Sequence, residues 1–141
     1  MEKRIVIDTC VFVSALLSSD GSSRKLLGQC LMNKYQPLMG TTLYNEYESL
    51  MKREVVFGDC VISSKERDEL LDAFASVCEW VHVYYLWRPN LRDEGDNHIF
   101  ELAIAGNAHA IITHNLKDFK NGQLLFPNTT ILTPIQLLKG D

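Results

Sequence analysis

The sequence has 141 residues, of which 46% are hydrophobic and 23% charged, and its formal net charge at pH 7 is −4. This length is typical of one domain with a buried core, so we expect a single domain over residues 1–141. The acidic total gives no reason by itself to expect a nucleic-acid ligand, and the apolar runs are too short for a signal peptide or a membrane span, so we expect a soluble, cytoplasmic protein.

The first predicted elements are one strand and two helices. The apolar run Ile5–Ile7 is typical of a strand buried on both faces, as in a parallel sheet. A helix is expected over Cys10–Leu17, and a second over residues 22–33 with Ser22 or Ser23 as its N-cap. The Gly and Ser residues between the two helices favour a turn.

The middle of the chain continues the alternation of strands and helices. A short strand is expected over Gln36–Met39, followed by a helix over residues 41–54 that one of its two leading threonines caps. Ser63-Ser64 predicts the cap of a longer helix over Lys65–Trp80, and Val81–Leu86 reads as a strand.

The last third contains one longer helix and two short strands. The helix is expected over Asp96–Ala105 and to end at Gly106-Asn107. Strands follow at Ala110–Thr113 and Thr130–Leu132, and Pro134 is placed to begin a closing helix. Strands alternating with helices at this spacing predict an α/β domain with a largely parallel central sheet and helices on both faces.

Two acidic residues of the first half stand at positions where ligands gather in such folds. Asp8 comes directly after a buried strand, and ligands of α/β folds bind beyond the carboxyl ends of strands. Glu46 lies at or beside the apolar face of its helix, which is formed by Leu43, Tyr47, Leu50 and Met51. The alternatives are a helix N-cap for Asp8 and a flanking residue with a solvated head for Glu46.

Two more acids follow in the second half. Asp96 opens its helix on the side of the apolar positions, and Asp118 follows the strand Ala110–Thr113 by one short turn, in which Asn115 can orient a carboxylate or a water. A first-turn acid and a polar turn are the simpler interpretations. Four acids on one edge need cations, however, and oxygen-only ligands select hard ions such as Mg²⁺ or Mn²⁺. Such ions near a phosphate are typical of metal-assisted phosphodiester hydrolysis.

Histidine and cysteine spacing argues against zinc and disulfides. The four cysteines are widely spread, and no two histidines have the spacing of a zinc site. His98 and His114 lie near the proposed acidic site and are candidates for contact with RNA.

Three segments together resemble the PIN-domain family. RIVIDTCVFVSALL resembles its opening strand and helix, TTLYNEYESLMKRE the helix with its second acid, and RDEGDNHIFELAIAGNAHAIITHNLKDF its third acid, the following strand and the terminal acidic turn. More narrowly, the sequence is similar to the VapC-like branch, the toxin components of toxin–antitoxin systems. The resemblance covers nearly the whole chain.

This resemblance implies a three-layer α/β/α sandwich with a mostly parallel central sheet and an Mg²⁺- or Mn²⁺-dependent endoribonuclease. It also implies a homodimer, an RNA substrate and a small antitoxin partner. Carried over by position, the catalytic and metal-binding acids are Asp8, Glu46, Asp96 and Asp118. The supporting polar residues are Thr9, Ser14 and Asn115.

The sequence departs from the family at three places. Cys10 stands where the family commonly has Asn, and Asn115 stands where close relatives often have Asp. Asp93 and Glu94 offer alternatives to Asp96 as the third acid. The first two departures favour the competing hypothesis, a catalytically weak PIN-like module that binds RNA or a protein. A phosphatase or a phosphoacceptor domain fits less well, because the acidic and basic residues they require are absent at the corresponding strand ends.

Overall fold

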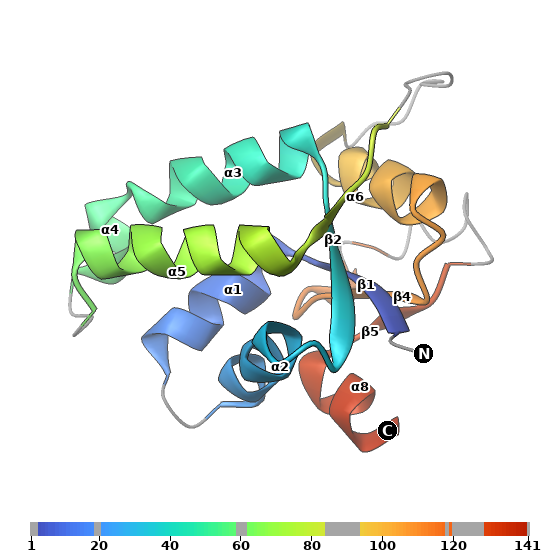
Figure 1. Ribbon diagram of the computed structural model, residues 1–141, viewed down its shortest axis with the longest axis horizontal. Helices are drawn as coiled ribbons and strands as arrows, with labels where there is room; N and C mark the ends of the chain where they lie inside the picture. Colours follow the sequence, from blue (N-terminus) through green and yellow to red (C-terminus); the bar gives the residue numbers. More distant parts are fainter. Residues whose placement is uncertain are drawn as a thin grey trace.

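The computed structural model describes residues 3–18, 21–58, 62–83, 94–117, 119 and 129–140, without the side chains of residues 54, 55 and 94–97. A parallel sheet of five strands in the order β3-β2-β1-β4-β5 forms its centre (Figure 1). The strands are β1 (Lys3–Ile7), β2 (Tyr35–Met39), β3 (Glu79–Trp80), β4 (Ala110–Ile112) and β5 (Ile131–Leu132). Long segments that contain helices separate these strands in the sequence, because a parallel neighbour requires a crossover connection.

Helices cover both faces of the sheet. They are α1 (Thr9–Leu17), α2 (Ser22–Leu31), α3 (Thr41–Met51), α4 (Glu54–Phe57), α5 (Ser64–Val77), α6 (Glu94–Ala105) and α8 (Pro134–Gly140). In Figure 1 the sheet runs between α6 on one side and α1, α2 and α5 on the other. The expected three-layer α/β/α fold is confirmed. Within the described ranges, no helix has the length and apolar character needed to cross a membrane.

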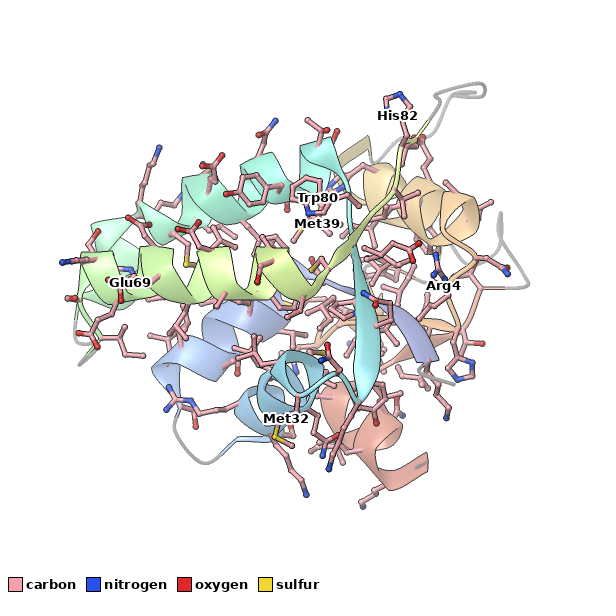
Figure 2. All side chains as sticks on the ribbon, in the orientation of Figure 1. Arg4, Met32, Met39, Glu69, Trp80 and His82 are labelled. Carbon is pink, nitrogen blue, oxygen red and sulfur yellow. The ribbon has the colours of Figure 1, made fainter. Side chains whose placement is uncertain are left out.

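The strand register brings several chain segments to one edge. Ile7 at the end of β1 pairs with Ile112 at the end of β4, and Met39 at the end of β2 pairs with Trp80 at the end of β3. Figure 2 shows Met39 and Trp80 next to each other. Because all the strands point the same way, the residues that follow them emerge at a shared carboxyl edge, where ligands bind in open α/β sheets.

Two predicted helix caps are wrong. Gly21 and Gly40, with no side-chain cap bond, are the N-caps of α2 and α3, in place of the serines and threonines expected there. The hydroxyl of Ser23 instead faces His114, at 2.9 Å from its Nε2. The cap of α5 is as expected: Ser63 and Glu66 form a complete capping box.

Helix α3 was expected to continue to residue 54, but it ends at Met51. The buried Arg67 of α5 donates its Nε–H to the Met51 carbonyl oxygen over 3.2 Å, and its guanidinium lies 4.4 Å from the centre of the Phe57 ring. This contact satisfies a carbonyl that has no partner inside the helix, so the chain turns there and α4 begins at Glu54.

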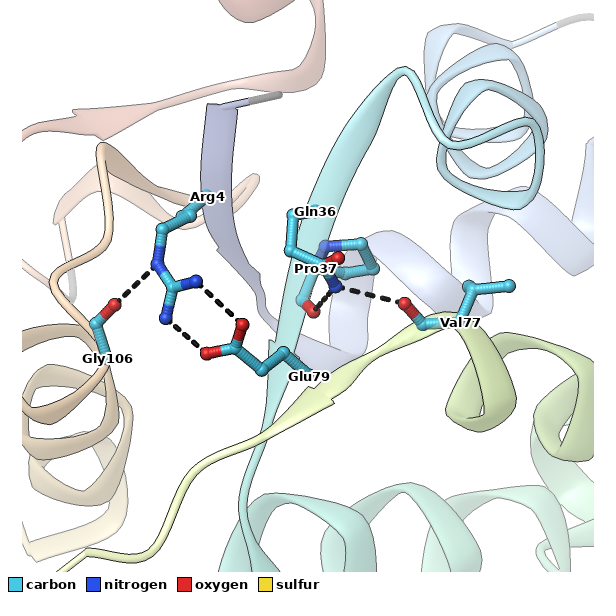
Figure 3. Close-up of polar contacts among 6 residues, drawn as sticks. All are labelled: Arg4, Gln36, Pro37, Val77, Glu79 and Gly106. Atoms are coloured by element: carbon cyan, nitrogen blue, oxygen red, sulfur yellow. Dashed lines mark hydrogen bonds and ion pairs between the residues drawn. The ribbon is translucent and has the colours of Figure 1, made fainter. Parts of the chain in front are cut away.

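Helix α5 was expected to extend to Trp80, but it ends at Val77 and Trp80 belongs to β3. The side chain of Gln36 donates to the Val77 carbonyl over 3.0 Å (Figure 3). Arg4 forms a two-pronged ion pair with Glu79 and donates from Nε to the carbonyl oxygen of Gly106 over 2.8 Å. These contacts hold residues 79–80 on the sheet as β3. The strand was expected over Val81–Leu86, so it begins two residues earlier than predicted. Residues 84–86 lie outside the described ranges.

Four leucines of α1 and α2 bear on the predicted homodimer. Leu16, Leu26 and Leu27 are buried in the core, whereas Leu17 is 51% exposed. Three of the four leucines therefore stabilise the monomer, and the homodimer stays a prediction.

Candidate functional site

Asp8 lies at the carboxyl edge of the sheet, between the end of β1 and the start of α1. Its backbone N–H donates to the Ile112 carbonyl oxygen, which continues the pairing of β1 with β4. Its extended backbone makes it the N-cap of α1, and its Oδ1 accepts from the N–H of Thr9 over 2.8 Å. The capping interpretation of Asp8 therefore describes the local geometry correctly. One carboxylate oxygen is sufficient for it, which leaves the second oxygen for other contacts.

The second oxygen of Asp8 faces the neighbouring strand. Its Oδ2 accepts from the hydroxyl of Thr113 over 2.9 Å and from the Cys10 thiol over 3.3 Å. Asp8 is only 7% exposed, and no Lys, Arg or His of the described residues forms an ion pair with it. Among the described residues, this buried carboxylate therefore has neutral donors in place of the positive partner that burial of a charge ordinarily requires.

The Cys10 thiol occupies the position at which the family commonly has Asn. It reaches Asp8 Oδ2, so the structure keeps a hydrogen-bond donor at this place, although a thiol is a weaker donor than an amide. Burial and the nearby Asp8 carboxylate raise the pKa of the Cys10 thiol above its ordinary value. The thiol is therefore protonated at neutral pH, which is the form that can donate.

Helix α3 is attached to the strand that precedes Asp8. The hydroxyl of the fully buried Tyr47 donates to the carbonyl oxygen of Ile7 over 2.6 Å, and burial raises the pKa of Tyr47 well above its ordinary value. Tyr47 follows Glu46 and Ile7 precedes Asp8 in the sequence. The bond therefore fixes the turn of α3 that contains Glu46 against the end of β1.

Glu46 makes a close contact with α6. Its Oε2 lies 2.6 Å from Nε2 of His98. The Glu46 side chain is 42% exposed, whereas that of His98 is 8% exposed. The carboxylate is thus open to solvent on one side and held by a buried ring on the other. His98 and Leu102 also line a cavity of about 210 Å³ at the start of α3.

The other predicted site residues have different outcomes. Asp96 lies in α6, which begins two residues earlier than expected, at Glu94, and the side chains of both residues lie outside the description. Asp118 and Asp93 lie outside the described residues. Thr9 is buried against Asp8, and its hydroxyl is 3.5 Å from Oδ1.

The two remaining supporting residues make no described side-chain contact with Asp8. Ser14 lies farther along α1, where its carbonyl accepts from the N–H of Ser18. The side chain of Asn115 is exposed, and its backbone N–H donates to the hydroxyl of Thr113 over 3.0 Å. Among the described contacts, Asn115 is linked to Asp8 through Thr113.

Sequence reasoning missed two hydroxyl groups of this site. Thr113 is fully buried, with its hydroxyl between Asp8 and the Asn115 amide. The sequence contains a signal for Thr113, because it is a polar residue at the end of the predicted buried strand Ala110–Thr113. Tyr47 gave no such signal, because its ring belongs to the apolar face of α3. Arg24 of α2 donates to the carbonyls of Ala15 and Leu16 and so stabilises the end of α1.

Two of the described acids are candidate ligands for a cation. Asp8 and Glu46 are oxygen ligands of the kind that hard divalent ions prefer. Among residues with described side chains, no group of three or more His, Cys, Asp or Glu side chains is close enough to hold a metal ion. Asp8 lacks a cationic partner within these ranges, so the donor chemistry fits a divalent ion for which Asp96 and Asp118 are the expected further ligands.

Comparisons with known proteins agree with this fold. Residues 4–117 match the family described as PIN domain. A solved structure, described as the crystal structure of VapBC2 from Rickettsia felis bound to a DNA fragment from their promoter, is similar with a TM-score of 0.60 and 20% sequence identity. The similarity covers 91% of this chain and 96% of that chain. Comparison with curated proteins gives no match. The family match spans most of the chain, and the chain therefore belongs to the PIN domain family.

Proposed function

We propose that this protein is an endoribonuclease that hydrolyses RNA phosphodiester bonds with the aid of Mg²⁺ or Mn²⁺. The observation that supports this most directly is the Asp8 carboxylate, buried at the carboxyl edge of the sheet without a cationic partner among the described residues. Burial of an unpaired carboxylate costs free energy, and the attraction of a bound cation would offset this cost. Membership of the PIN domain family supports the same interpretation.

Each described residue has a distinct role in this proposal. Asp8 and Glu46 would bind the metal together with Asp96 and Asp118. The hydroxyl of Thr113 and the amide of Thr9 hold the two oxygens of Asp8 in fixed directions. When bound, the ion would polarise the phosphodiester and lower the pKa of a water molecule. Attack by water would leave 5′-phosphate and 3′-hydroxyl ends.

The test compares two variants on the same helix. Glu46→Gln removes the charge of a proposed ligand, and Glu48→Gln makes the same change two residues farther along α3, where the side chain borders a surface groove with Lys52 and Asp68. Purified protein is incubated with single-stranded and structured RNA in Mn²⁺, in Mg²⁺ and in chelator. We expect metal-dependent cleavage that Glu46→Gln lowers by orders of magnitude and Glu48→Gln leaves within about threefold.

The outcomes separate the competing functions. Cleavage that persists after thorough metal removal would contradict the metal mechanism. Binding of RNA without cleavage in either metal would favour the alternative, a catalytically weak PIN-like module that binds RNA or a protein. Equal loss of activity in the two variants would show that Glu46 has no special role.

We further propose that the protein acts as a toxin controlled by a small antitoxin. The likeness to the VapBC2 structure supports this partner. An apolar groove of about 240 Å³ between α1, α2 and α5, lined by Leu16, Leu27 and Leu70 among others, is a described surface suited to an apolar partner segment. The product of a small adjacent reading frame should co-purify with the protein and inhibit cleavage. If it does neither, a free-standing nuclease is the better interpretation.

A further inference from the structure

The contact between His98 and Glu46 has a defined direction. A carboxylate oxygen only accepts hydrogen bonds, so Nε2 of His98 must donate its hydrogen to Oε2 of Glu46 over the 2.6 Å that separates them. The ring is held by α6, whose neighbouring residues Ile99 and Phe100 are buried in the core. A rigid buried donor thus holds one oxygen of a half-exposed acid.

The other nitrogen of the ring shows that packing alone does not account for His98. Its Nδ1 is buried and has no hydrogen-bond partner in the described structure. A buried polar atom without a partner costs free energy, because it loses its hydrogen bond to water. An apolar side chain at this position would avoid that cost. The contact with Glu46 is therefore the described polar contact that favours a histidine at this position.

We propose that His98 is a positioning residue for metal binding. By occupying Oε2 it selects one orientation of Glu46 and leaves Oε1 free to face the divalent ion. An exposed glutamate otherwise samples several rotamers, and ordering it on binding weakens the affinity. Partners that orient ligand side chains in this way typically change metal affinity 10- to 100-fold. This inference rests on the proposed function, because it requires Glu46 to be a ligand.

A purely structural role makes a different prediction. If the contact only ties α3 to α6, its loss lowers the melting temperature of the metal-free protein and leaves the dissociation constant for Mn²⁺ unchanged. If it positions Glu46, the dissociation constant changes even after the effect on stability has been accounted for. Direct titration of the folded full-length protein with Mn²⁺, without RNA, distinguishes the two.

Two variants at the same position test the inference. In His98→Gln the side-chain amide nitrogen can reach the place of Nε2 and donate to Glu46. In His98→Asn the shorter amide reaches only the place of Nδ1, so the donor is lost. We expect the Mn²⁺ dissociation constant, measured by calorimetry, to rise 10- to 100-fold in His98→Asn and to stay within about threefold of wild type in His98→Gln. The Mn²⁺ concentration for half-maximal cleavage should change in parallel.

The results separate the inference from the function on which it rests. Equal Mn²⁺ affinity in wild type and His98→Asn, with both folded by circular dichroism, would overturn the positioning role and leave the nuclease intact. Equal weakening in both variants would show that the Nε2 donor is not the relevant group. If wild type binds no Mn²⁺ and cleaves no RNA, the proposed function and this inference both fall.

Discussion

The hydroxyl of Thr113 connects the two strands that end at the proposed site, and Thr113→Val removes it with almost no change of shape. In the structure this hydroxyl donates to Asp8 Oδ2 over 2.9 Å and accepts from the Asn115 amide over 3.0 Å. Thr113 is fully buried. After the change, Asp8 Oδ2 keeps only the weaker Cys10 thiol, at 3.3 Å, as a described donor.

The expected loss follows from the charge of the acceptor. A hydrogen bond to a charged group contributes about 1.5–3 kcal/mol to the free energy of unfolding. We therefore expect Thr113→Val to lower this free energy by about 2 kcal/mol. Thr113→Ser keeps the hydroxyl and loses one buried methyl group, which costs about 1 kcal/mol.

The assay is chemical and thermal denaturation of wild type, both Thr113 variants, and Thr113→Val combined with Asp8→Asn, all without metal. At about 3 °C per kcal/mol for a chain of this length, Thr113→Val should melt about 6 °C below wild type. The effect of Thr113→Val should be smaller in the Asp8→Asn background, because the acceptor there is neutral. A valine variant as stable as the serine variant would refute the importance of this bond.

Three further predictions concern charge. Asp8→Asn keeps the helix cap and should abolish most cleavage. A hundredfold excess of Mn²⁺ over its dissociation constant should raise the free energy of unfolding of wild type by about 2.7 kcal/mol and that of Asp8→Asn by less. Equal rises in melting temperature would show that Asp8 is not a ligand. The Asp8 carboxylate helps to raise the pKa of the Cys10 thiol, so Asp8→Asn should increase the fraction of Cys10 that is thiolate near pH 9. Alkylation of Cys10, measured by mass spectrometry, should therefore be faster in the variant. An unchanged rate would contradict this coupling. The hydrogen-bonded ion pair with Arg4 lowers the pKa of Glu79 in the folded protein. The contribution of this pair to stability is therefore present above the pKa that Glu79 has in the unfolded chain, and it is lost as the pH falls through the pKa of Glu79 in the folded protein. Denaturation at pH 5 and pH 3 should show a smaller loss of stability in Glu79→Gln than in wild type, and identical losses would rule out this contribution.

Some of this protein could be read directly from local sequence. Buried strands can be recognised as short apolar runs. The predicted strand Ile5–Ile7 therefore has the same end as β1, which begins two residues earlier, and the predicted strand Ala110–Thr113 exceeds β4 by one residue. Asp8 is recognisable as a candidate site residue because a charge directly after such a run is unusual. Ser63 and Glu66 predicted the start of α5 correctly because a capping box uses only neighbouring residues. These features depend on contacts within a few positions along the chain.

Other features depended on residues far apart in the sequence. The ends of α3 and α5 were misplaced because Arg67 and Gln36 satisfy the terminal carbonyls of those helices across the fold. The partners of the acids were hidden for the same reason: Thr113 reaches Asp8 from 105 positions away, and His98 reaches Glu46 from 52. The sequence by itself determined the alternation of elements and the acids at their ends, since hydrophobic period and capping are local. Only the tertiary structure decided which hydroxyl, thiol or imidazole faces each carboxylate, because strand order and helix packing choose those neighbours.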